Sequence, residues 1–259
     1  DLSAYDSAQI IREGLDEKLI SKHCILPIFK RGNLLYVATS NPTNIEAMDA
    51  IRFSSKMNIE AIIVEHQKLH QLIEQNFMSL GMGLIETGMA WFWSGARVKK
   101  WFDVEGYDNL INALKEQRGV MVVGVHFMSL ELGGRVMGLC QPMMATYRPH
   151  NSALMEWVQT RGRMRSNKAM ISRNNLRGMV GALKKGEAVW FAPDQDYGRK
   201  GSSFAPFFAV KDVATTNGTF VISRLSGASM LTVTMVRKTD NSGYRLFIMP
   251  ELENYPQEE

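Results

Sequence analysis

The sequence has few cysteines and no long apolar run. Its 259 residues include two cysteines, Cys24 and Cys140, which lie far apart and lack metal-ligand spacing. We therefore expect two buried, reduced thiols, as in proteins of the cytosol, and not a disulfide-stabilised secreted domain. No apolar segment is long enough to span a bilayer, and no secretory signal peptide is visible.

The sequence also lacks a GxxxxGK[ST] phosphate-binding loop, internal repeats and low-complexity segments. Its composition, 45% hydrophobic and 22% charged, is that of an ordinary globular protein of one large or two small domains. The net charge of +4 is unevenly divided, with −2 on residues 1–77 and +6 on residues 78–259. This asymmetry indicates two units with different partners.

Acidic residues are absent between Glu156 and Glu187. The basic residues of that span are Arg161, Arg163, Arg165, Lys168, Arg173, Arg177, Lys184 and Lys185. A solvated face is the ordinary explanation for such a run, but eight uncompensated cations favour phosphate or polyanion binding. Nucleic-acid binding is the weaker alternative, because few aromatic residues are interleaved and no recognition motif is present. We expect no nucleic-acid partner.

Short apolar segments alternate with helical patterns along the whole chain. They predict an α/β fold, in which a mostly parallel sheet flanked by helices is preceded by a small αβ module at residues 1–77. In that module, strands at 34–38 and 59–64 flank a helix and predict a parallel crossover. The segment 78–101 has apolar residues on most faces, so it is either buried or packed against lipid, and burial is the commoner case. Residues 213–226 read as a helix, and a hairpin after residue 229 as an antiparallel edge of the sheet.

The chain is organised around the stretch GVMVVGVHFMSLELGGR, which begins at Gly119. It predicts a buried strand, a turn with Gly124 at a close approach, and a helix capped by Ser129. His126 then stands at the end of the strand, with Glu131 in the first turn of the helix. In open α/β sheets, ligands bind beyond the carboxyl ends of the strands, so a base and a carboxylate are expected where chemistry is done.

Two further polar groups follow neighbouring strands. Arg148 comes after the predicted strand 143–147, and Asp194 and Asp196 come after the strand 187–192. We expect Arg148 and Asp194 at the same sheet edge as His126. Two isolated aspartates supply too few ligands for a metal ion, so we expect Asp194 to have an orienting or substrate-binding role. The H-x4-[DE] spacing alone is weak evidence, because about 0.5 chance matches are expected in such a chain.

Residues from about 76 to 259 resemble the lipid A biosynthesis lauroyl acyltransferases, a branch of the glycerolipid-type acyltransferases with the H-x4-[DE] motif. The resemblance is carried by GMGLIETGMAWFW, VVGVHFMSLELGGRVMGL, ATYRPHN, RGRMRSNKAM, ALKKGEAVWFAPDQDYG and FAPFFAV. It implies transfer of a lauroyl-type chain from acyl carrier protein to a hydroxyl of a Kdo-bearing lipid A precursor. His126 would be the general base and Glu131 the group that orients its ring.

The same resemblance implies a set of substrate-binding residues. It implies no cofactor and no metal, and acyl carrier protein carrying the acyl chain is the co-substrate. Arg148 and Arg163 would stabilise an oxyanion or hold a phosphate or sugar-acid carboxylate. The expected substrate-binding residues are Arg148, Arg161, Arg163, Arg165, Lys168 and Asp194. The cytoplasmic face of the inner membrane is the expected location, with peripheral attachment because the family's anchoring helix is missing.

Residues 1–77 resemble the N-terminal domain of type IV pilus assembly and type II secretion ATPases, on the pattern P-[IL]-x(3)-G-x-x-L-x-V-A-x-x-x-P-T-N. We expect two domains, a small αβ module at 1–77 and an acyltransferase domain at 78–259 that is truncated at its C-terminus. The competing interpretation is an inactive chimera that acts only as a binding or interaction module.

Overall fold

The computed structural model describes residues 17–195, 200–207 and 210–256, and the chain divides into two compact units. Unit 1 comprises Asp1–Gly83 and Phe204–Ala214, and unit 2 comprises Leu84–Ser203 and Thr215–Glu259. Helix α3 (His66–Phe92) runs without a break through the position where the sequence predicted a domain boundary, after residue 77.

Unit 1 is built around a three-stranded sheet. Its elements are α1 (Glu17–His23), β1 (Ile25–Arg31), β2 (Leu34–Thr39), α2 (Ile45–Ser55), β3 (Asn58–Ile63) and the first part of α3. Strands β2 and β3 pair in parallel, which confirms the predicted crossover. Asn44 begins α2, because its side-chain oxygen accepts a hydrogen bond from the Ala47 N–H at 3.1 Å. Strand β1, which the sequence analysis did not predict, pairs antiparallel with β2.

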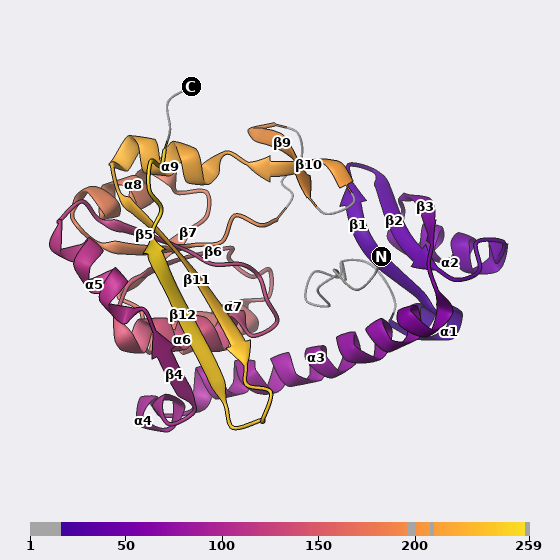
Figure 1. The fold of residues 1–259 in the computed structure, drawn as a ribbon, viewed down its shortest axis with the longest axis horizontal. Coiled ribbons are helices and arrows are strands. Elements are labelled where there is room, and N and C mark those ends of the chain that lie inside the picture. Colours follow the sequence, from indigo (N-terminus) through magenta and orange to yellow (C-terminus); the bar gives the residue numbers. More distant parts are fainter. Residues whose placement is uncertain (1–16, 196–199, 208–209, 257–259) are drawn as a thin grey trace. The chain divides into compact units, whose positions relative to one another are not determined.

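Unit 2 contains a seven-stranded sheet in the order β4-β12-β11-β5-β8-β6-β7 (Figure 1). Its strands are β4 (Phe102–Glu105), β5 (Val120–Val123), β6 (Met144–Tyr147), β7 (Ala169–Ser172), β8 (Ala188–Phe191), β11 (Ser229–Arg237) and β12 (Tyr244–Glu251). The pairs from β11 through β7 are all parallel, which confirms the mostly parallel α/β fold. The hairpin β11–β12 is antiparallel as predicted, but it lies inside the sheet, and β4 forms that edge.

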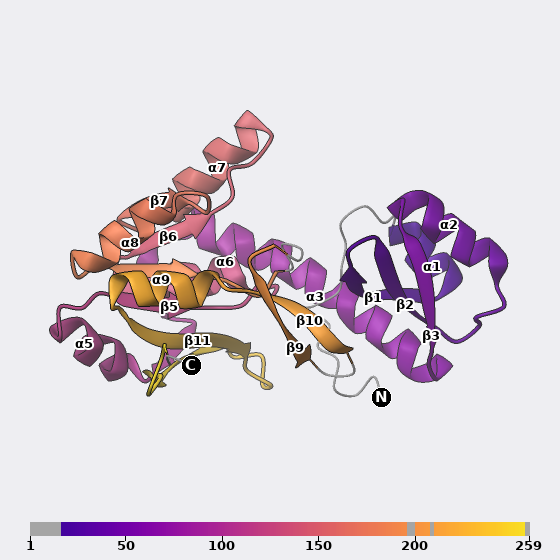
Figure 2. The same ribbon diagram turned by 90° about the horizontal axis from the view of Figure 1, so that it is seen from above.

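Helices cover both faces of this sheet (Figures 1 and 2). The last turns of α3 pack on one face together with α4 (Gly95–Lys99), α5 (Tyr107–Lys115) and α6 (Leu130–Cys140), and α8 (Leu176–Lys184) and α9 (Gly218–Ser226) pack on the other. Strand β5 contributes side chains to both faces of the sheet. Val120 and Val122 pack in the hydrophobic core beneath α3–α6, and Met121 packs in the core beneath α8 and α9. This two-sided burial explains why β5 is a continuous apolar run.

Residues 213–226 are not one helix as predicted. Strand β10 (Val210–Thr216) comes first, pairs with β9 (Ser202–Phe207), and is followed by α9 from Gly218. The stretch Val213–Thr216 is rich in β-branched side chains, which favour strands over helices. The prediction also missed the short strand β7 within the basic run, next to α7 (Ala153–Arg163).

Candidate active site

The parallel register of β5 and β8 brings His126 and Asp194 together. Val123, the last residue of β5, pairs with Phe191, the last residue of β8. His126 and Asp194 each lie three residues beyond that pair, and Gly124 N–H continues the ladder by donating to the Phe191 carbonyl at 3.0 Å. Both side chains therefore stand at the carboxyl edge of the sheet, as the sequence predicted.

Asp194 holds His126 through two hydrogen bonds. The His126 backbone N–H donates to Asp194 Oδ2 at 2.7 Å, and the ring nitrogen Nδ1 lies 2.6 Å from Asp194 Oδ1. An ionised carboxylate only accepts hydrogen bonds, so Nδ1 carries the proton in this pair. The other ring nitrogen, Nε2, is then an acceptor, and 36% of the side chain of His126 is exposed. His126 can therefore receive a proton from an approaching hydroxyl.

The pKa of the Asp194 carboxyl lies below its ordinary value. Burial raises this pKa, but the hydrogen bonds from the side chain and backbone of His126 act in the opposite direction and outweigh it. Asp194 is therefore ionised at neutral pH, as the hydrogen-bonding pattern requires.

Gly124 is needed for a close contact beneath His126. A Cβ at this position would lie 2.3 Å from Cζ2 of Trp190, a residue of β8. The expected close approach at Gly124 is confirmed, with the Trp190 side chain as the neighbour. The Trp190 indole therefore packs directly against the backbone two residues before His126.

Glu131 does not hold the His126 ring, contrary to the prediction. Its Oε2 accepts hydrogen bonds from Trp91 Nε1 at 2.9 Å and from Arg163 Nε at 3.1 Å. Its Oε1 pairs with Arg163 Nη2. The first turn of α6 points this carboxylate toward α7 and α3, so Glu131 forms a bidentate ion pair with Arg163. Asp194, and not Glu131, is hydrogen-bonded to the imidazole.

A second glycine allows this ion pair to form. A Cβ on Gly162 would lie 2.5 Å from Cγ of Trp91, so the last turn of α7 packs closely on the indole. Arg163 follows directly and reaches Glu131, while Arg165 Nη1 donates to the Trp91 carbonyl at 2.6 Å. Trp91 was not predicted as a site residue, since its segment carries apolar residues on most faces and shows no polar signal.

The remaining predicted substrate-binding residues are divided between the two edges of the sheet. Arg148 follows β6 and is exposed at the His126 edge, and Arg161 is exposed on α7. Lys168 precedes β7 and pairs with Glu187, which precedes β8, at 2.6 Å. Because β7 and β8 run in the same direction as β5, Lys168 lies at the opposite edge from His126, and the structure does not bring it to the site. Asp196 lies outside the described residues.

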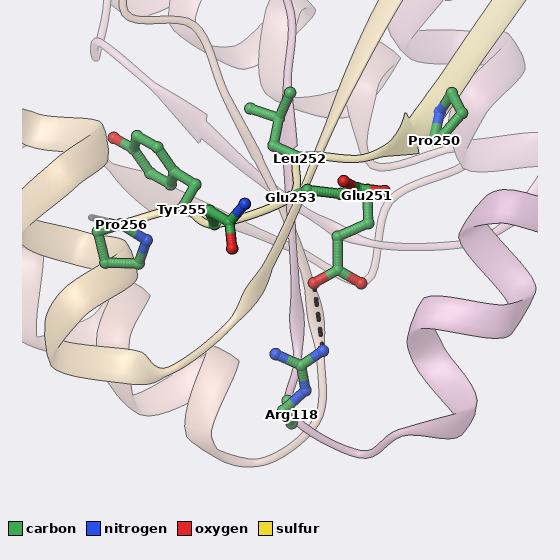
Figure 3. A pocket seen from close by; sticks show the side chains of 8 residues that line it. Arg118, Pro250, Glu251, Leu252, Glu253, Tyr255 and Pro256 are labelled. Atoms are coloured by element: carbon green, nitrogen blue, oxygen red, sulfur yellow. Dashed lines mark hydrogen bonds and ion pairs between the residues drawn. The ribbon is translucent and has the colours of Figure 1, made fainter.

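An open pocket lies at that opposite edge as well (Figure 3). Its lining comes from Arg118, which precedes β5, and from the end of β12 with the chain that follows it. Arg118 Nη2 lies 3.2 Å from Glu251 Oε1. The pocket is therefore separate from His126. Among the described residues, no group of three His, Cys, Asp or Glu side chains is placed to hold a metal ion.

Comparisons with known proteins point to one family for most of the chain. Residues 41–259 match the family described as bacterial lipid A biosynthesis acyltransferase. The chain is 76% identical over 207 residues to the lipid A biosynthesis palmitoleoyltransferase of Escherichia coli K12, covering 79% of this chain and 68% of that protein. The lauroyltransferase of the same strain is 46% identical over 195 residues, or 74% of this chain and 64% of that protein.

The N-terminal part has a different relative. Over 78 residues, the chain is 58% identical to the type IV pilus assembly ATPase PilB of Acinetobacter baylyi, which covers 30% of this chain and 14% of that protein. The predicted resemblance of this part is confirmed as a similarity to a small fragment of that ATPase. With a family match over most of its length and the relatives above, the chain belongs to the bacterial lipid A biosynthesis acyltransferases and is an acyltransferase enzyme.

Proposed function

We propose that the protein transfers a fatty acyl chain from acyl carrier protein to a hydroxyl of a Kdo-bearing lipid A precursor, with His126 as the general base. The observation that carries this proposal is the fixed tautomer of His126. Asp194 occupies Nδ1 at 2.6 Å, which leaves the partly exposed Nε2 to accept a proton.

In the proposed reaction, Nε2 of His126 takes the proton of the acceptor hydroxyl as its oxygen attacks the thioester carbonyl carbon. A C–O bond forms, and the carbonyl oxygen becomes an oxyanion. The C–S bond then breaks, and the thiol of acyl carrier protein leaves with the proton held by the imidazolium. Asp194 stabilises that imidazolium between the two proton transfers, so no covalent acyl-enzyme is needed.

The cations around the site have two proposed roles. Arg163, held in place by Glu131, and Arg148 stabilise the oxyanion or bind a phosphate or sugar-acid carboxylate of the acceptor. Glu131 is then a positioning residue, which acts through Arg163 and not through the imidazole. Arg161 and Arg165 add positive charge for the anionic acceptor and for acyl carrier protein, which is acidic.

The identity of the transferred acyl chain distinguishes the relatives of this enzyme. The sequence resemblance implied a lauroyl donor, yet the E. coli relative at 76% identity is named for palmitoleoyl transfer, and the lauroyl one is at 46%. We therefore propose that palmitoleoyl is the better donor, and lauroyl transfer stays a prediction to be tested beside it.

We also propose that the enzyme works at the cytoplasmic face of the inner membrane, where a lipid acceptor is accessible. No helix among the described residues is long and apolar enough to cross a membrane. Peripheral contact with the membrane surface is the proposed mode for the part of the protein described by the structure.

Acyl transfer from labelled lauroyl- and palmitoleoyl-acyl carrier protein to the detergent-dispersed Kdo-bearing precursor tests the proposal. We expect His126→Ala to abolish transfer and His70→Ala, which removes an exposed histidine of α3, to leave it unchanged. Transfer that survives His126→Ala would refute the assigned base. No transfer by a folded wild-type chain would instead favour the alternative, a chimera that only binds partners.

A further inference from the structure

One face of α7 exposes large apolar side chains to solvent. Leu154 is 68% exposed and Trp157 is 59% exposed, and Met164, just past the end of the helix, is 42% exposed. With Arg161 between them, these positions are spaced by three, four and three residues, so they form a single stripe along the helix. We call Leu154, Trp157, Arg161 and Met164 the α7 stripe.

The opposite face of α7 packs against the rest of unit 2. Gly162 packs on Trp91, and Arg163 pairs with Glu131. Glu156 also faces inward, accepting hydrogen bonds from Tyr147 Oη at 3.0 Å and from the His150 backbone N–H at 2.7 Å. In Figure 2, α7 projects beyond the sheet of unit 2. The exposed stripe is thus the outward face of a helix whose inner face supports the site.

The charge around the stripe has one sign. The Arg161 guanidinium lies 5.5 Å from the centre of the Trp157 ring, and Arg165 follows Met164. Glu156 is the single acidic residue between Arg148 and Arg165, and its carboxylate is engaged on the inner side. The outward surface therefore combines a tryptophan, a leucine and the Arg161 guanidinium, and the carboxylate of Glu156 is bonded elsewhere.

We propose that the α7 stripe docks the enzyme on an anionic lipid bilayer, with Leu154 and Trp157 inserted at the level of the headgroups and Arg161 bound to lipid phosphates. This inference rests on the proposed function, in which the acceptor is a lipid. Helices with tryptophan and leucine on one face and arginine beside them lie in the membrane interface, and indole rings are most stable there. Because the same helix carries Arg163, which pairs with Glu131, docking through α7 would hold that ion pair near the membrane surface, on the inner side of the helix.

A bilayer fits this stripe better than acyl carrier protein does. An acidic protein would be bound by the arginines alone, and the exposed Leu154 and Trp157 side chains would add little to that attraction. A bilayer uses both features, since apolar side chains enter the interface and each arginine near an anionic surface strengthens binding about fivefold.

Vesicle binding of the full chain tests the proposal directly. Wild-type protein is mixed with vesicles of phosphatidylcholine containing phosphatidylglycerol, and with vesicles of phosphatidylcholine alone, and the bound fraction is measured by flotation. We expect tighter binding to the anionic vesicles, at least a tenfold loss in Leu154→Ser/Trp157→Ser, and about a fivefold loss in Arg161→Gln. The matched controls are Leu225→Ser and Arg224→Gln on α9, where Leu225 is 51% exposed; they should bind like wild type.

Tryptophan fluorescence provides a second readout that does not depend on the double variant folding. Anionic vesicles should shift the emission of the wild type to shorter wavelength, and Trp157→Phe should remove that shift. Equal vesicle binding by wild type and Leu154→Ser/Trp157→Ser would overturn the proposal. A shift caused by acyl carrier protein but not by vesicles would also overturn it, in favour of a protein-docking face.

Transfer assays with the precursor either in vesicles or in detergent distinguish a failure of membrane docking from a failure of the proposed catalytic function. With the precursor embedded in vesicles, the double variant should lose at least tenfold in transfer rate, whereas with the precursor dispersed in detergent it should match wild type. His126→Ala should show the reverse pattern, with vesicle binding retained and transfer absent in both conditions. A double variant equally impaired in detergent would contradict docking as the role of the stripe.

Discussion

The carboxylate of Asp194 accepts hydrogen bonds from both the backbone N–H and the ring of His126, at 2.7 Å and 2.6 Å. Two bonds from one carboxylate fix both the position of the residue and the plane of its imidazole. Because the ring bond also selects the tautomer, the pair is a structural unit with a direct chemical consequence.

Asp194→Asn should therefore lower kcat strongly. The amide can keep the shape of the pair, but it does not stabilise an imidazolium and can favour the wrong tautomer, so a loss of about a thousandfold or more is expected. Steady-state transfer assays with both acyl donors measure this change, and circular dichroism checks the fold. Activity within tenfold of wild type would contradict the assigned partnership.

The lowered pKa of Asp194 predicts a pH-dependent contribution to stability. A carboxyl whose pKa is lower in the folded state stabilises the protein at pH values above its unfolded pKa, about 3.9, and this contribution is lost as the pH falls through the folded pKa. Urea unfolding of wild type and Asp194→Asn between pH 5.5 and 3 measures the difference. The free energy of unfolding of wild type should exceed that of Asp194→Asn by less as the pH falls. A difference that grows toward acid pH would contradict the lowered pKa of Asp194.

Glu131→Gln should destabilise unit 2 as well as reduce activity. The side chains of Glu131 and Arg163 are only 18% and 19% exposed, so removing one charge leaves the other buried and unpaired, at a cost of about 3 kcal/mol. Urea denaturation measures the loss, and a double-mutant cycle with Arg163→Gln isolates the pair. Additive effects of the two substitutions would show that the pair contributes no coupling energy.

Gly124→Ala should disturb the chain beneath His126. The new methyl group would lie 2.3 Å from Trp190, so the indole or the backbone must move, at about 1–3 kcal/mol and with a loss of transfer activity. The control is Gly134→Ala in α6, where a Cβ meets no atom within 4 Å and a gain of about 0.5–1 kcal/mol is expected. Melting temperatures that fall equally in both variants would argue against the steric explanation.

Arg135→Met should stabilise the protein. Arg135 is 5% exposed in α6, and its Nε and Nη1 atoms have no hydrogen-bond partner among the described residues. Burial, with the nearby charge of Arg165, lowers the pKa of its guanidinium. A buried donor without a partner costs about 1–3 kcal/mol in lost hydration, so replacing Arg135 by an apolar side chain of similar length should recover stability of that order. Arg135→Lys keeps the charge and should not gain stability, so unfolding midpoints that rise equally in both variants would contradict the charge-based explanation.

Much of the local structure follows from the sequence. The apolar run at Val120–Val123 predicted a strand covered on both faces, and the alternating pattern around it predicted the mostly parallel sheet, because both signals arise from neighbouring residues. The same reasoning placed His126 and Asp194 at one edge of the sheet. It failed at Val213–Thr216, where β-branched residues pair with β9 although they precede a helix.

Which carboxylate reaches the imidazole was decided only by the tertiary structure. Sequence spacing favoured Glu131, five residues after His126, but the direction of a side chain in the first turn of α6 depends on what that helix packs against. Here it faces Trp91 and Arg163, which come from α3 and α7. Asp194 is 68 residues from His126, and the two meet because β5 and β8 are neighbours in register. Strand order depends on long-range pairing, so local sequence determined the position of His126 and the fold determined its partner.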